Sequence, residues 1–198
     1  MIDMFVVPFL RFRQFAIPFL VLSVIALPCW LVFRLYRHRA LGRPHREILL
    51  LTVVVYLLIL AAVTLAPNRN SRVRADATAG IELHPKLASL TCSSAFLPSG
   101  STAQGFCVRN ARGNVMLFFP LGIFLPLVWR HLRFWRGMQI AIALSFGIEL
   151  VQYLSRTWSD RSADVNDVVL NGLGACLGLA LVSLLRLLQG TRPAVPRA

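Results

Sequence analysis

Polar residues able to do chemistry gather in two neighbouring apolar stretches, SFGIELVQYLSR and DRSADVNDVVLNGLG. In each stretch they stand at positions i, i+3 and i+7, which places them on one stripe of a helix: Glu149, Gln152 and Arg156 in the first, and Asp164, Asp167 and Asn171 in the second. An ionisable group inside an apolar span costs several kcal/mol unless it is partnered. We therefore expect the two stripes to face each other and to form a functional cluster.

Two further residues are candidates for the same cluster. Asn114 begins the preceding apolar stretch, and Arg161 stands between the two stripes. One interpretation is a self-satisfied network, in which Arg161 pairs with Asp164 or Asp167 and the amides bridge. The other is a recognition site, in which Arg161 donates to phosphate or carboxylate while the acids accept from amines and hydroxyls. Both interpretations can hold together, because a satisfied network can open to a ligand.

Several kinds of chemistry are poorly supported. No histidine lies in an apolar stretch or near the cluster, which disfavours histidine-based zinc sites and Ser/His dyads. Three carboxylates would suit Mg²⁺, but the neighbouring arginines compete with any cation, so we expect neither a metal nor a cofactor. Asp164 and Asp167 stand three residues apart on one helix, which is poor geometry for gripping a water from two directions.

The elements that position these residues are apolar helices. The chain has 198 residues, of which 57% are apolar and 15% charged, which excludes a water-soluble globule. Five stretches are long enough to cross a hydrocarbon core about 30 Å thick. They run from about Gln14 to Phe33, Glu47 to Ala66, Asn114 to Trp129, Gly137 to Leu154, and Val165 to Leu185. The sequence thus predicts an all-α, polytopic transmembrane bundle of about five spans.

The net charge of +13 indicates topology rather than nucleic-acid binding. Three short segments, the linkers after the first and third spans and the tail, carry 11 basic residues in about 33, whereas the opposite side carries 10 in about 71. Because short connections weigh most in the positive-inside rule, we expect the amino terminus outside and the carboxyl terminus in the cytoplasm.

This topology divides the chain into four regions. They are two amino-terminal spans (1–66), an extracytoplasmic loop (67–113), a three-helix core (114–185) and a cytoplasmic tail (186–198). Cys92 and Cys107 lie in the loop and are a disulfide candidate, since disulfides persist in oxidising compartments. A bridge there would contribute about 3 kcal/mol, although two unpaired thiols remain an alternative. Gly174 and Gly178 form a GxxxG pair, which predicts close helix packing that holds the polar hairpin together.

The chain resembles the VanZ-like family of small bacterial membrane proteins over about residues 110–180. Three blocks carry the resemblance, in the family's order: Asn114 with Leu117, Phe118, Pro120 and Gly122; Glu149 with Gln152; and Arg161, Asp164, Asp167, Asn171 and Gly174. The resemblance implies a helical, multi-pass protein of the bacterial cell membrane and envelope, whose namesake is associated with low-level resistance to the glycopeptide teicoplanin. The stretch IELHPKL from Ile81 to Leu87 and the long outer loop depart from the family pattern.

Three functions are compatible with these residues. The first is a binding protein in which the outer-facing cluster contacts an envelope lipid or a glycopeptide headgroup, with the lipid bilayer as surrounding partner and no nucleic acid. The second is a membrane enzyme that acts on a lipid-linked cell-wall precursor, with Glu149 or Asp164 as general acid or base. The third is a structural partner of another membrane protein. The sequence leaves the oligomeric state open.

Overall fold

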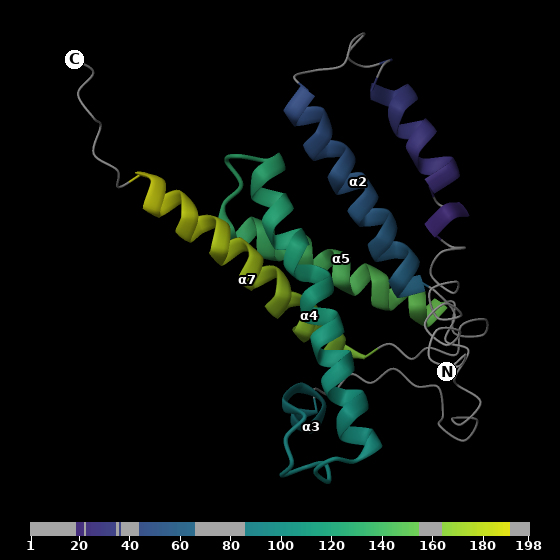
Figure 1. The fold of residues 1–198 in the computed structure, drawn as a ribbon, viewed down its shortest axis with the longest axis vertical. Coiled ribbons are helices and arrows are strands. Elements are labelled where there is room, and N and C mark those ends of the chain that lie inside the picture. Colours follow the sequence, from purple (N-terminus) through teal and green to yellow (C-terminus); the bar gives the residue numbers. More distant parts are fainter. Residues whose placement is uncertain are drawn as a thin grey trace, which may run out of the picture. The chain divides into compact units, whose positions relative to one another are not determined.

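A computed structural model describes residues 19–21, 23–34, 36, 44–65, 86–154 and 164–190. Four of its helices are long and apolar enough to cross a membrane: α2 (Pro44–Leu65), α4 (Thr102–Val128), α5 (Phe134–Leu154) and α7 (Val165–Gly190). A five-residue helix, α3 (Leu87–Thr91), precedes α4 (Figure 1). The predicted all-α, multi-pass fold is confirmed, and the part of the chain that the structure describes contains no strand.

The first predicted span corresponds to a shorter apolar helix, Phe19–Arg34, and the beginning of that span lies outside the described residues. The third span differs most from its prediction, because α4 begins at Thr102 and not near Asn114. Ser101 caps this helix by accepting a hydrogen bond from the backbone N–H of Gln104 at 3.1 Å. The start of this span was predicted from hydropathy, and hydropathy does not detect helical turns made of polar residues before the apolar part of the helix.

The described chain divides into two compact units. One comprises Met1–Gly80 with Leu150–Ser162, and the other comprises Ile81–Glu149 with Ala163–Ala198. In the first unit, Arg34 forms an ion pair with Glu47 near the start of α2. The second unit contains α3, α4, α7 and most of α5, and therefore almost all of the polar residues singled out above.

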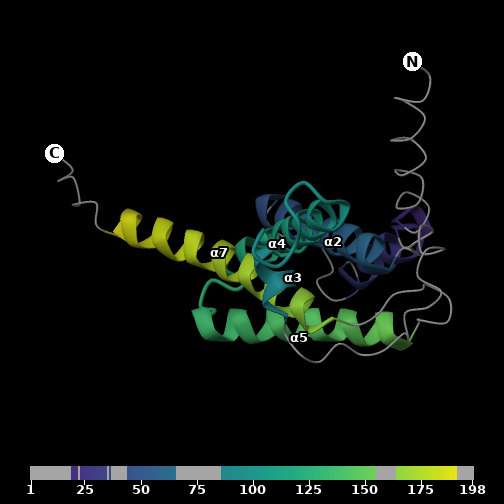
Figure 2. The same ribbon diagram turned by 90° about the horizontal axis from the view of Figure 1, so that it is seen from below.

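Helices α4 and α7 cross in close contact through glycines (Figures 1 and 2). A β-carbon added at Gly178 would lie 2.9 Å from the Cα of Gly122 and closer still to the carbonyl oxygen of Phe119, while one at Gly174 would meet the carbonyl oxygen of Val115. Backbones approach this closely only where both helices present small residues. The GxxxG pair therefore packs α7 against α4, whereas we had expected it to hold the hairpin of α5 and α7.

Helix α5 packs on another face of α7 through side chains. Ala141 and Ser145 of α5 are fully buried, and a β-carbon at Gly137 would lie 2.8 Å from a methyl group of Leu179. A β-carbon at Gly172, by contrast, would lie 3.9 Å from its nearest neighbour, a side-chain carbon of Ile142. The amino-terminal part of α7 thus has α4 on one side and α5 on another, which decides where its polar residues point.

Candidate functional site

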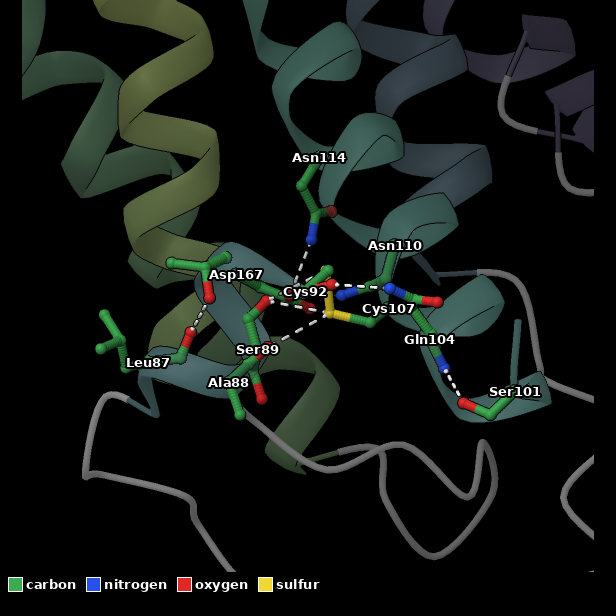
Figure 3. The surroundings of a disulfide bond; sticks show 11 residues. Leu87, Ala88, Ser89, Cys92, Ser101, Gln104, Cys107, Asn110, Asn114 and Asp167 are labelled. Carbon is green, nitrogen blue, oxygen red and sulfur yellow. Dashed lines mark hydrogen bonds between the residues drawn. A yellow bond between two sulfur atoms is a disulfide. The ribbon is translucent and has the colours of Figure 1, made fainter. Parts of the chain in front are cut away.

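Asp167 lies in the first turn of α7 and faces α4. Its Oδ1 accepts hydrogen bonds from the side-chain amides of Asn114, at 2.6 Å, and Asn110, at 2.8 Å (Figure 3). The two asparagines are four residues apart on α4, so one helix face delivers both donors to the same carboxylate. The sequence analysis named Asn114 and Asp167 but missed Asn110. The i, i+4 spacing of the two asparagines was the signal that would have identified it.

Asp164 caps the start of α7 and faces α5. Its backbone N–H donates to Oε2 of Glu149 at 2.9 Å, and its own Oδ1 accepts from the backbone N–H and side-chain amide of Asn166, at 2.8 and 2.6 Å. Glu149 is only 6% exposed, so a buried carboxylate of α5 holds the first residue of this turn. The sequence analysis placed Asp164 and Asp167 on one stripe. The Asp167 carboxylate reaches α4, whereas the Asp164 carboxylate caps its own helix and only its backbone N–H contacts α5.

Asn166 is a second residue that the sequence analysis missed. Its side chain is 1% exposed, and its Oδ1 accepts from the backbone N–H of Lys86 at 2.9 Å. Because Lys86 immediately precedes α3, this bond attaches the start of α3 to the start of α7. Asn166 stands outside the i, i+3, i+7 stripe, so periodicity did not indicate it.

Asn171 and Ser145 form a polar pair deeper between α7 and α5. The Asn171 amide donates to Oγ of Ser145 at 2.9 Å, and the two side chains are 3% and 0% exposed. The Oδ1 of Asn171 is buried and has no hydrogen-bond partner among the described residues. If the amide oxygen and nitrogen were exchanged, the nitrogen would lack a hydrogen-bond partner in place of the oxygen. One polar atom in this pair is therefore left to accept or donate a further bond.

Gln152 forms a hydrogen bond with a helix that the sequence analysis did not assign to the cluster. Its side-chain amide donates to the carbonyl oxygen of Thr64 at 2.7 Å. Thr64 belongs to the last turn of α2, where carbonyl groups lack partners within the helix, so Gln152 satisfies one of them. Arg156 and Arg161 lie outside the described residues.

A disulfide joins Cys92 and Cys107, with their Cα atoms 5.7 Å apart (Figure 3). Cys92 directly follows α3 in a left-handed conformation, at φ 50°, and Cys107 lies in the second turn of α4. The disulfide therefore attaches the end of α3 to α4, while the Lys86–Asn166 bond attaches its beginning to α7. Helix α3 contacts both longer helices at the end where Asn110, Asn114 and Asp167 meet.

The assembled site is rich in carboxylate and carboxamide groups and lies at one end of α4 and α7. Within the described residues, no three His, Cys, Asp or Glu side chains come together as a metal site. A protein-family model described as VanZ/LLP1 matches residues 53–186, which is more than half of the chain and includes every site residue named above from α4, α5 and α7.

The chain belongs to the VanZ/LLP1 family. It is also similar to Protein VanZ of Enterococcus faecium, with 30% identity over 76 residues. That alignment covers 38% of this chain and 45% of the relative, so less than half of the relative's length is matched. No solved structure matches the chain. Family membership and the four apolar helices identify a multi-pass bacterial membrane protein of the VanZ kind.

Proposed function

We propose that this VanZ-like protein binds the headgroup of an envelope lipid or of a glycopeptide such as teicoplanin through the polar end of α4, α5 and α7. One observation carries the proposal: two carboxylates, Asp167 and Glu149, are held in place by neighbouring N–H groups within a bundle of apolar helices. The unfilled Oδ1 of Asn171 supports it, because a buried acceptor without a donor lowers stability and is retained where it serves a ligand.

We propose that this polar end faces the outside of the cell. The disulfide between Cys92 and Cys107 supports this orientation, since disulfides persist in oxidising compartments. The opposite end of α4 supports it as well. The short connection to α5 carries Arg130 and Arg133, the first turn of α5 carries Arg136, and basic residues concentrate on the cytoplasmic side.

In this proposal, Asp167 and Glu149 accept hydrogen bonds from amine or hydroxyl groups of the ligand. Asn114 and Asn110 fix the Asp167 carboxylate, and Asn171 accepts one further donor. Arg161 remains the predicted partner for a phosphate or carboxylate of the ligand, since a guanidinium binds either group in a bidentate manner. The proposal that the ligand is teicoplanin rests on the resemblance to VanZ. The alignment with this chain covers 45% of that relative.

The test is glycopeptide tolerance in cells that express variants of the full chain. We expect Asp167→Asn and Arg161→Ala each to abolish the tolerance that the wild type confers, while the amount of protein in the membrane stays normal. Gln189→Glu is the matched control, because it exchanges an acid and an amide of the same size at an exposed position at the other end of α7. Unchanged tolerance in well-expressed Asp167→Asn cells would overturn the proposal.

A second candidate function is catalysis on a lipid-linked cell-wall precursor, with Glu149 or Asp164 as general acid or base. The observation that favours it is the burial of the Glu149 carboxylate beside the start of α7. Purified protein would be incubated with lipid-linked precursors and the products weighed by mass spectrometry. Catalysis would be established if the wild type changed the mass of a precursor and Glu149→Gln did not. The absence of turnover across several precursors would rule against it.

A further inference from the structure

A second polar feature lies on α4, away from the carboxylate site. It is a depression of about 300 Å³ over the first three turns of the helix, lined by Ser101, Gly105, Val108, Arg109 and Arg112 among others. These positions are three or four residues apart, so they share one helix face. That face is rotated by roughly 100–160° from Asn110 and Asn114, at 100° per residue, and hence points away from α7.

The depression exists because Gly105 provides no side chain. A β-carbon added there would meet nothing within 4 Å, so the space above the helix is open. Gln104 does not fill it, since its side chain accepts from the backbone N–H of Gly100 at 2.8 Å and donates to the carbonyl oxygen of Cys92 at 3.4 Å. The polar lining available to a ligand therefore comprises two guanidinium groups, the Ser101 hydroxyl and the second N–H of the Gln104 amide.

Both arginines are exposed and uncompensated. Arg109 and Arg112 form no hydrogen bond and no ion pair with any residue that the structure describes. They stand three residues apart, so their guanidinium groups can converge on one ligand. Ten donor N–H groups, about five from each arginine, are available to a planar or tetrahedral oxyanion.

The length of α4 places these charges at the level of lipid headgroups. Twenty-seven residues span about 40 Å, roughly 10 Å more than the hydrocarbon core. Trp129 follows the last turn of α4 and is 56% exposed, as is typical of an aromatic residue at a membrane interface. A helix needs about 20 residues to cross a hydrocarbon core. Arg109 stands that far before Trp129 and therefore lies at the other interface.

We propose that this depression binds the phosphate group of an anionic membrane lipid. Arg109 and Arg112 take the phosphate oxygens, Ser101 donates one further hydrogen bond, and the apolar surface of Val108 and Gly105 lies against the lipid below the headgroup. A lipid fits better than free phosphate because the lining is partly apolar and open at headgroup depth. The site shares no residue with the proposed carboxylate site, so the two proposals can fail separately.

The test is native mass spectrometry of the full, disulfide-bonded chain in detergent, with phosphatidylglycerol added as anionic lipid and phosphatidylcholine as neutral lipid. We expect the wild type to retain one phosphatidylglycerol and to prefer it over phosphatidylcholine. Arg109→Gln with Arg112→Gln should weaken this binding by at least about tenfold, since both charge-assisted hydrogen bonds to the phosphate are lost. The matched control is Arg133→Gln with Arg136→Gln, which removes the same charge at the same spacing and should change affinity less than about twofold.

A filling variant tests the depression itself. Gly105→Leu places a side chain in open space, so the variant should fold normally. Its affinity for the lipid should fall by a factor similar to that of the double arginine variant. Gly147→Leu on α5 is its control, because a β-carbon there also meets nothing within 4 Å. Any of three results would overturn the proposal. They are an equal loss of lipid affinity in the two double arginine variants, undiminished lipid binding in Gly105→Leu, and displacement of the lipid by millimolar inorganic phosphate.

Discussion

Asp164 and Asp167 illustrate how strongly a residue's role depends on its neighbours. They lie three residues apart in the first turn of α7, yet Asp164 engages α5 through Glu149 and Asp167 engages α4 through Asn110 and Asn114. The Asp164 carboxylate accepts from Asn166 of its own helix, so only the Asp167 side chain reaches across to a neighbouring helix. The backbone of Asp164 and the carboxylate of Asp167 therefore hold α7 against both neighbours.

The Ser145–Asn171 pair predicts an unusual response to mutation. Ser145→Ala removes the hydroxyl to which the Asn171 amide donates and should lower the free energy of unfolding by about 1–3 kcal/mol. Ser145→Ala combined with Asn171→Val removes the polar pair and its unfilled acceptor, so stability should recover to the wild-type level or above. Thermal unfolding in detergent measures both values. A double variant less stable than Ser145→Ala would show that the pair stabilises the protein.

That double variant also relates stability to function. Because it lacks the acceptor assigned to the ligand, it should confer no glycopeptide tolerance even though it is stable, as expected where a binding site reduces stability.

At the scale of helices, α3 and the glycines of α4 and α7 decide the geometry of the polar end. The disulfide attaches α3 to α4, and the Lys86–Asn166 hydrogen bond attaches it to α7. Immediately below, Gly174 lies on the backbone of Val115, one residue after Asn114. This close approach of the two backbones brings the Asn114 amide to 2.6 Å from the Asp167 carboxylate.

The glycine contact predicts a sharp contrast between two substitutions on α7. Gly178→Ala should separate the helices and lower the free energy of unfolding by about 1–3 kcal/mol, because its β-carbon would meet the α4 backbone. Gly172→Ala has room for its β-carbon, at 3.9 Å from Ile142, and should be neutral or stabilising by up to about 1 kcal/mol. Melting temperatures of the two variants measure the difference. Equal melting temperatures would show that the α4–α7 contact tolerates a methyl group.

At the scale of the whole molecule, the disulfide and the arginines make the same prediction about orientation. The end that carries Cys92 and Cys107 should face outside, and the connection between α4 and α5, with Arg130 and Arg133, should face the cytoplasm. The opposite orientation would place a disulfide in a reducing compartment and the densest arginine clusters outside.

Thiol labelling tests this orientation in intact spheroplasts. In a Cys29→Ser, Cys176→Ser background, a membrane-impermeant reductant and maleimide should label two thiols per chain without lysis. The control replaces all four cysteines with serine and adds Gln189→Cys at the other end of α7, where labelling should require permeabilisation. Labelling of Cys92 and Cys107 only after lysis would reverse the topology.

Four apolar helices, their order and the family could be predicted from the sequence, because apolar length and polar spacing are local properties. The helix start at Thr102 could not be read from hydropathy, since a Ser101 cap and about three turns rich in polar residues precede Asn114. Candidate residues from Asn114 to Asn171 could be proposed from the sequence, because polar groups in apolar spans are conspicuous. Asn110 was missed because hydropathy put the start of its helix near Asn114, and Asn166 was missed because it stands outside the stripe in its helix.

The sequence by itself determined which residues are polar, roughly where apolar helices run and which two cysteines could pair. Only the tertiary structure decided the partners: Gln152 with Thr64, Asp167 with Asn110 and Asn114, and the GxxxG pair with α4. The physical reason is that periodicity defines the face of a helix on which a residue lies, whereas the helix that packs against that face is determined by long-range contacts.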